Sequence, residues 1–297
     1  MHTPTGGFPA TGPEGIGIID TMLGIPEDDR ESWYEFLKPQ LRDRESLEEF
    51  EFPAQYMFKD VPGGPTGDPV EWTLAQMDAH GIDTALIGYA TEGPQARALK
   101  EHPDRFVAAA AIDPNEGMDG VRALRDAVEA GGAVAAQWFP AGNHPQVPIN
   151  DRRVYPFYAA CVELDIPIFV CAGVPGPRVP MLCQHVELID EVCWFFPELR
   201  FVMRHGAEPW ADLAVKLMLK WPNLYYSTSA FAPRYYPKAI IDYANTRGAD
   251  KVIYAGYFPM GLTLERIMAE LRDVPLRAEV WPKFLRDNAR KVLKLDD

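Results

Sequence analysis

The sequence predicts an α/β fold in which eight parallel strands, most of them followed by a helix, close into a (β/α)8 TIM barrel. Eight short apolar runs are spread along the chain, and they are continuous rather than alternating, which is typical of strands buried on both faces. The length of 297 residues suits one barrel domain. No Gly-x-Gly-x-x-Gly or other glycine-rich phosphate loop follows any run, which favours the closed barrel over an open nucleotide-binding sheet.

The chain divides into an arm, one insertion and a regular alternation of strands and helices. Residues 1–15 are rich in Gly, Pro and Thr, so we expect a loose arm. Residues 27–68 combine charged and aromatic side chains, which predicts a helical insertion after the first strand that caps the barrel mouth. The expected strands are residues 16–19, 84–88, 106–112, 133–138, 168–171, 201–203, 224–228 and 252–256. The expected helices are residues 70–81, 95–100, 117–130, 154–164, 187–195, 212–219, 237–246, 264–271 and 280–293.

Local signals justify individual elements. In residues 70–81, Val70, Leu74 and Met77 recur at helical spacing, and Gly81 ends the pattern. Residues 201–203 form a short apolar run followed by a charged pair and a glycine, which indicates a buried strand that turns towards a helix.

Composition excludes several classes of function. The net charge of −14 argues against nucleic acid as a partner, because phosphate binding needs a basic surface. No apolar run approaches the roughly 20 residues of a membrane span, and the first residues show no secretory signal. The four cysteines lack Cys-x-x-Cys spacing, so we expect reduced thiols in a cytoplasmic protein that acts on a small molecule.

Three residues at strand ends are the candidate catalytic groups. In a TIM barrel the active site lies at the C-terminal ends of the strands. His205 follows the sixth strand, Asp20 ends the first and Tyr257 follows the eighth. We expect His205 to exchange protons with substrate, Asp20 to orient the imidazole and Tyr257 to donate a hydrogen bond or a proton. The plainer alternative is a histidine bonded to a neighbouring carbonyl group.

Three strings make the second half of the chain resemble the amidohydrolase-related family. They are residues 196–206 with Pro209 and Trp210, residues 223–230, and residues 250–260, and they resemble the motifs of that family's sixth, seventh and eighth strands. The family comprises metal-dependent TIM-barrel hydrolases and decarboxylases, such as those acting on aminocarboxymuconate semialdehyde and hydroxybenzoates. The resemblance implies the same fold, a lytic reaction and a dimer formed through the outer helices.

The metal-binding positions implied by this resemblance are altered. The family carries histidines after an acidic residue in strand one, and here Met22 and Gly24 stand in those places after Asp20. The metal-binding histidine of strand five corresponds to Cys171, and the metal-binding aspartate of strand eight corresponds to Tyr257. Methionine and glycine are poor or absent ligands for hard divalent ions.

Two cofactor hypotheses follow. Either no metal is bound, or one divalent ion (Zn, Mn or Fe) is held by Asp20 and His205, with Cys171 and Tyr257 completing a mixed set of ligands. The substrate pocket would be formed by Trp138, Arg178, Trp210, Arg234 and Cys171, since an arginine can bind a carboxylate through two parallel hydrogen bonds and a tryptophan can line a pocket. For each of these residues the alternative is core packing or a surface ion pair.

Three functions remain open. The first is a hydrolase or decarboxylase that acts on an apolar carboxylate or its coenzyme A thioester by acid–base chemistry. The second is a nonheme-iron TIM-barrel oxygenase acting on a substrate linked to coenzyme A. The third is an inactive barrel that serves as partner subunit of an active paralogue. We expect a homodimer for the first two and a hetero-oligomer for the third.

Overall fold

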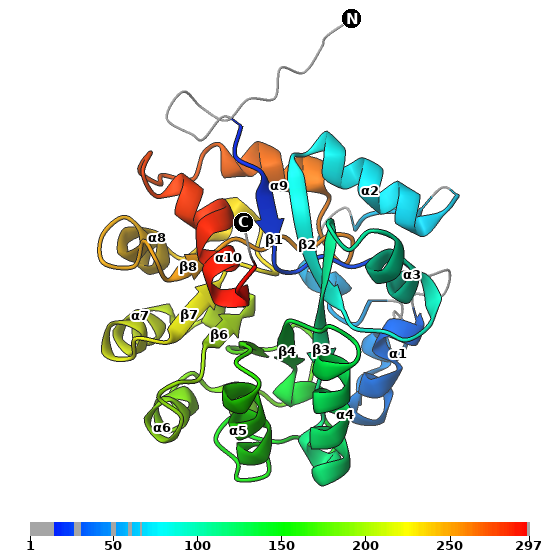
Figure 1. The fold of residues 1–297 in the computed structure, drawn as a ribbon, viewed down its shortest axis with the longest axis vertical. Coiled ribbons are helices and arrows are strands. Elements are labelled where there is room, and N and C mark those ends of the chain that lie inside the picture. Colours follow the sequence, from blue (N-terminus) through cyan, green and yellow to red (C-terminus); the bar gives the residue numbers. More distant parts are fainter. Residues whose placement is uncertain (1–14, 27–30, 49–51, 59–60, 66, 296–297) are drawn as a thin grey trace, which may run out of the picture.

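Eight strands form one sheet in sequential order, and every neighbouring pair is parallel. The computed structural model describes residues 15–295 except 27–30, 49–51, 59–60 and 66, so the predicted arm lies almost wholly outside the described residues. Figure 1 shows the curled sheet with the helices around its outside. The TIM-barrel prediction is confirmed.

The strands and helices fall close to the predicted ranges. The strands are β1 (Ile18–Asp20), β2 (Ile82–Gly88), β3 (Phe106–Ala111), β4 (Ala135–Trp138), β5 (Ile168–Cys171), β6 (Phe201–Arg204), β7 (Leu224–Ser227) and β8 (Val252–Ile253). The helices are α1 (Arg44–Glu48), α2 (Pro69–Ala79), α3 (Gly93–Glu101), α4 (Met118–Glu129), α5 (Tyr155–Glu163), α6 (Leu188–Phe195), α7 (Ala211–Lys220), α8 (Lys238–Ala244), α9 (Leu264–Leu271) and α10 (Asn288–Leu293). The last predicted helix is divided, because a π-helical turn at Lys283–Asp287 precedes α10. No helix among the described residues has the length and apolar character needed to cross a bilayer.

The first and last strands meet through contacts beyond the regular ladder. An isolated parallel bridge joins Leu23 to Phe258, and the Gly24 N–H donates to the Phe258 carbonyl at 2.9 Å. The Thr21 hydroxyl donates to the Tyr254 carbonyl at 2.9 Å. These bonds bring the ends of β1 and β8 together, so the sheet closes at the end where the site is expected.

The barrel interior contains an apolar layer with a more polar layer above it. Each strand contributes one residue to the apolar layer, which α10 covers from below; the eight residues are Ile19, Leu86, Ala109, Ala135, Phe169, Val202, Tyr225 and Ile253. Because side chains alternate along a strand, the residues two positions further on also face inwards. That second layer includes Thr21, Gln137, Cys171, Arg204 and Ser227. The larger apolar core lies between the strands and the outer helices.

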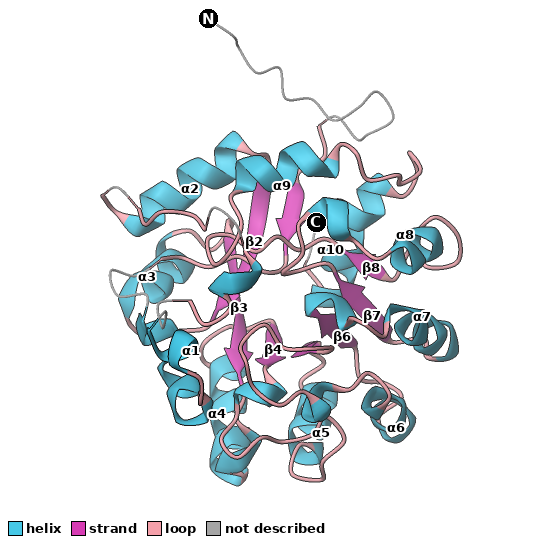
Figure 2. Cartoon of the chain, turned by 180° about the vertical axis from the view of Figure 1, so that it is seen from behind, coloured by secondary structure: helices cyan, strands magenta, loops and turns pink. Residues whose placement is uncertain are grey.

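The described part of the insertion lies against the C-terminal end of the barrel. It consists of 3₁₀ turns at Glu31–Gln40 and Gln55–Met57 on either side of α1. Phe58 stacks on Tyr257 with ring centroids 5.4 Å apart, and Phe52 lies 6.4 Å from the same ring. Figure 2 shows this side of the molecule, with α1 beside the sheet. The aromatic residues of the insertion therefore cover the mouth near the end of β8.

Candidate active site

The turn after β6 holds the most unusual backbone of the mouth. His205, Gly206 and Ala207 have φ angles of +66°, +85° and +53°, all in the left-handed region. A residue with a Cβ costs about 1–2 kcal/mol in that region, so His205 and Ala207, on either side of Gly206, both need support from their surroundings. The Tyr226 hydroxyl donates to the Gly206 carbonyl at 2.9 Å, and the Ser229 hydroxyl accepts the His205 N–H at 3.1 Å. The strand after the turn therefore fixes the histidine in place.

The imidazole of His205 is partly buried and held by one hydroxyl group. Its Nδ1 lies 3.0 Å from Ser229 Oγ, and its ring meets the Tyr257 ring edge-on at 5.5 Å. Burial and then the neighbouring Arg204 charge lower the pKa of His205 to about 3. The imidazole is therefore neutral at pH 7. The expectation that Asp20 orients it is not met, because Ser229 makes that contact.

Asp20 instead links the end of β1 to the segment that follows β8. Its Oδ1 accepts the N–H groups of Met22 and Gly256, both at 2.9 Å, while Oδ2 has no hydrogen-bond partner in the described ranges of the chain. A Cβ placed on Gly256 would lie 2.6 Å from Asp20 Oδ2 and 3.4 Å from both the Ile267 side chain and the Tyr254 hydroxyl. The carboxylate thus faces outwards, towards α9, and not into the mouth with His205. Burial raises its pKa to about 6, against the effect of the two backbone hydrogen bonds and Arg204.

Arg204 is the charged side chain that does lie inside the barrel. It is 4% exposed. Its Nη1 donates to Gln137 Oε1 at 2.9 Å, its Nη2 lies 3.4 Å from the Thr21 carbonyl oxygen, and its Cζ lies 5.2 Å from the centre of the Phe169 ring. Its Nε has no hydrogen-bond partner among the described residues. Burial lowers the pKa of the guanidinium, which remains charged at neutral pH.

Two predicted anion-binding arginines are already paired with carboxylates. Arg178 forms ion pairs with Asp43 at 2.8 Å and with Glu45 at 3.0 Å, and these contacts raise its pKa. Arg234 lies 3.6 Å from a carboxylate oxygen of Glu270. Both arginines therefore already contact carboxylates at the protein surface, which is the alternative given above for each.

The remaining predicted residues divide between core and mouth. The Trp138 indole is buried and donates to Asn143 at 2.6 Å, and the Trp210 ring packs on His185 at 4.0 Å. Cys171 is buried, and burial raises its pKa to about 12, so it is a protonated thiol. Burial also raises the pKa of the Tyr257 hydroxyl well above 10, which makes it a proton-bearing donor at the mouth.

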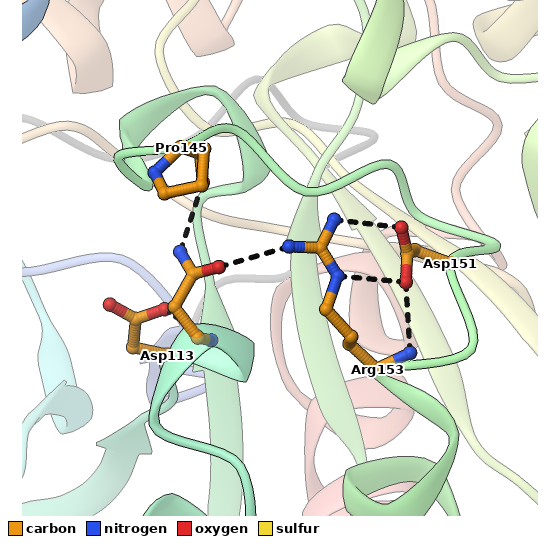
Figure 3. Close-up of polar contacts among 5 residues, drawn as sticks. Asp113, Pro145, Asp151 and Arg153 are labelled. Atoms are coloured by element: carbon orange, nitrogen blue, oxygen red, sulfur yellow. Dashed lines mark hydrogen bonds and ion pairs between the residues drawn. The ribbon is translucent and has the colours of Figure 1, made fainter.

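The rim on the side of β3 and β4 is held by a polar network. The Asn115 side chain donates to the Pro145 carbonyl at 2.9 Å and accepts from Arg153 at 3.1 Å, while Arg153 pairs with Asp151 at 2.8 Å. Figure 3 shows Pro145, Arg153 and Asp151 in this network. Asp113, at the end of the third strand, accepts the Asn115 N–H at 2.9 Å. The Asp113 carboxylate therefore stabilises its own loop. Hydrogen bonds and an ion pair between the loops after β3 and β4 hold this side of the rim in place.

Comparison with known proteins identifies the family. Residues 27–295 match the family model described as amidohydrolase. The chain belongs to the amidohydrolase family. No curated protein shows significant similarity to it.

Solved structures of amidohydrolase-like barrels share the fold at low identity. An uncharacterised TIM-barrel protein, Bb4693 from Bordetella bronchiseptica, is 23% identical, with a TM-score of 0.73 over 94% of this chain and 98% of that chain. The 5-carboxyvanillate decarboxylase from Novosphingobium aromaticivorans, solved with manganese and 4-hydroxy-3-methoxy-5-nitrobenzoic acid, is 17% identical, with a TM-score of 0.68 over 95% and 97%. The 2,6-dihydroxybenzoate decarboxylase from Rhizobium is 16% identical, with a TM-score of 0.66 over 95% and 99%.

The residues present do not fit the divalent metal that the amidohydrolase family implies. Within the described part of the chain, no three His, Cys, Asp or Glu side chains come together as metal ligands. Asp20 faces outwards, so the mixed set of ligands considered above does not assemble. The Arg204 cation lies beside one of these positions, since Cys171 and Arg204 are partners in the register of β5 and β6.

Sequence reasoning assigned no role to Arg204 or to Ser229. The alternation of side chains along β6 could have found Arg204, because Val202 faces inwards and Arg204 lies two residues later. No comparable signal exists for Ser229, because its contact with His205 depends on the left-handed turn after β6.

Proposed function

We propose that this member of the amidohydrolase family is a lytic enzyme, a decarboxylase or hydrolase, that acts on an apolar carboxylate by acid–base chemistry of its own side chains. The observation that carries the proposal is the neutral imidazole of His205, held by Ser229 on a strained turn at the C-terminal end of β6. Strained, supported residues at such a place are characteristic of functional sites.

Ser229 allows the neutral imidazole either to accept a proton or to donate a hydrogen bond through Nε2. When Nδ1 carries the hydrogen and donates it to Ser229 Oγ, Nε2 has a free lone pair and acts as a base. When the Ser229 hydroxyl donates to Nδ1, Nε2 carries the hydrogen. The Tyr257 hydroxyl, which keeps its proton, supplies a hydrogen-bond donor for a substrate oxygen.

Aromatic residues at the mouth favour a substrate with an apolar or aromatic body. Phe52, Phe58 and Tyr257 form a continuous aromatic cluster over the end of β8, and ring faces bind flat carbon skeletons well. Two of the structural neighbours are named as decarboxylases of substituted benzoates, and another is named as a 4-oxalomesaconate hydratase. Two surface hollows, between α7 and α8 and between α6 and α7, lie away from this cluster.

The test is a His205→Asn variant assayed with hydroxylated and methoxylated benzoates for release of carbon dioxide or acid. Asparagine tolerates the left-handed backbone but has no titrating nitrogen, so the fold should survive while turnover falls by about 100-fold or more. His102→Asn, at the end of α3, is the matched control and should leave turnover unchanged. Full activity in folded His205→Asn would contradict the proposal.

A further inference from the structure

We propose that Arg204 forms a fixed anion-binding site on the barrel axis, which takes the substrate's carboxylate at the place where other amidohydrolases hold a metal cation. The identification of the anion as a substrate carboxylate rests on the proposed function. The anion site itself rests on the contacts of Arg204 alone.

The contacts of Arg204 place its positive charge across the barrel interior. The side chain starts on β6 and reaches Gln137 on β4 and the carbonyl of Thr21 beyond β1, passing over Phe169 of β5. A side chain that touches strands on both sides of the barrel must cross its axis. Cys171, at one of the altered metal-ligand positions, is the register partner of Arg204 on the neighbouring strand.

Within the part of the chain that the structure describes, no carboxylate is hydrogen-bonded to the guanidinium. Its two hydrogen-bond acceptors, the Gln137 amide oxygen and the Thr21 carbonyl, are both neutral, and Nε donates to nothing among the described residues. Arg97 and Arg200 differ from Arg204 in this respect, because each forms an ion pair with an aspartate at 2.6 Å. Asp20 acts on Arg204 only through space, because one carboxylate oxygen accepts two backbone N–H groups and the other faces α9.

A buried cation with a free donor is suited to one organic anion. Burial of an unpaired charge is costly, and an incoming carboxylate would remove that cost while accepting the Nε hydrogen. An arginine fork binds a carboxylate through two parallel hydrogen bonds, and here Nε together with one Nη can provide them. Phe169 lies below the guanidinium, and Tyr257 with the Phe58 ring stacked on it lies at the mouth. These surroundings favour an aromatic monocarboxylate over a phosphate or a small polar acid.

The test measures binding of benzoate to the whole protein by titration calorimetry, with EDTA present. The wild type should bind benzoate saturably and bind benzamide, which has the same shape without the charge, at least about 30-fold more weakly. Arg204→Met should lose at least about 30-fold in benzoate affinity, and Arg204→Lys, which keeps the charge but not the fork, should lie between the two. Arg122→Met removes an exposed charge on α4 and should bind like the wild type.

Several results would overturn the inference. They are absence of benzoate binding to the wild type, equal affinity for benzoate and benzamide, an unchanged affinity in folded Arg204→Met, and binding that appears only after manganese is added. Circular dichroism establishes whether Arg204→Met is folded. If it is not, the ratio of benzoate to benzamide affinity in the wild type tests the anion site. His205→Asn should keep benzoate affinity, so loss of catalysis without loss of binding separates this inference from the proposed function.

Discussion

The pH dependence of stability should reveal the buried, neutral state of His205. An unfolded histidine takes up a proton as the pH falls through about 6.5, but in the folded protein this imidazole resists protonation down to a pH of about 3. Over that interval the unfolded state binds more protons than the folded state. The free energy of unfolding must therefore decrease as the pH falls.

The size of the effect follows from the pKa difference. One pKa unit corresponds to about 1.36 kcal/mol, so the whole interval from 6.5 to about 3 amounts to about 5 kcal/mol. Between pH 7.5 and pH 5, where the protein is easier to handle, the same relation gives a loss of about 2 kcal/mol. Asp20 acts in the opposite sense: its folded pKa of about 6 lies above the ordinary 3.8, so it adds about 1.4 kcal/mol over the same fall in pH.

Urea unfolding at pH 5, 6 and 7.5 separates the two groups. His205→Asn should lose about 2 kcal/mol less than the wild type between pH 7.5 and pH 5. Asp20→Asn, which keeps one oxygen for the N–H groups of Met22 and Gly256, should lose about 1.4 kcal/mol more than the wild type. Parallel curves for the wild type and both variants would refute the assignment of these pKa values and with it the neutral imidazole.

Three further substitutions test the support of the site and the fold. Ser229→Ala removes the group that positions His205, so turnover should fall by about 10-fold or more with little change in KM and with a shifted pH profile; an unchanged pH profile would show that the serine has no such role. Gly256→Ala would place a methyl group 2.6 Å from Asp20 Oδ2 and should lower the unfolding free energy by about 1–3 kcal/mol in urea titrations, whereas wild-type stability would contradict the tight junction of β1 and β8. Asp68→Ala removes the N-cap of α2, so we expect about 1 kcal/mol of destabilisation and a lower Tm, with Asp68→Asn recovering most of it; equal loss in both variants would assign the effect to the Arg97 ion pair instead.

The fold could be predicted because its signals are local and repeated. Strands buried on both faces produce continuous apolar runs, and each helix has its own spacing and stop, so β5 and α9 begin and end at the predicted residues. The eighth strand is shorter than predicted, ending at Ile253 and not at Gly256. Beyond Ile253 the chain bonds to side chains of Asp20 and Thr21, and no sequence pattern reveals such contacts.

The site was harder to predict because it depends on the direction in which each side chain points. Asp20 ends the first strand, yet it follows Ile19, which faces inwards, and so it faces outwards. Arg204 points inwards for the converse reason, as the second residue after Val202. A position at the end of a strand therefore does not identify a site residue until it is known whether the side chain points into the barrel or away from it. The role of Ser229 additionally depends on three left-handed residues, whose conformation the sequence does not encode in a simple pattern.

A crystal structure of the protein grown with benzoate and manganese together shows whether Arg204 or a metal ion binds the carboxylate. We expect benzoate in the barrel, with its carboxylate oxygens about 3 Å from Nε and one Nη of Arg204 and with its ring beneath Phe58 and Tyr257. Manganese bound at the strand ends, with the Arg204 side chain turned away and the benzoate bound to the metal, would contradict it.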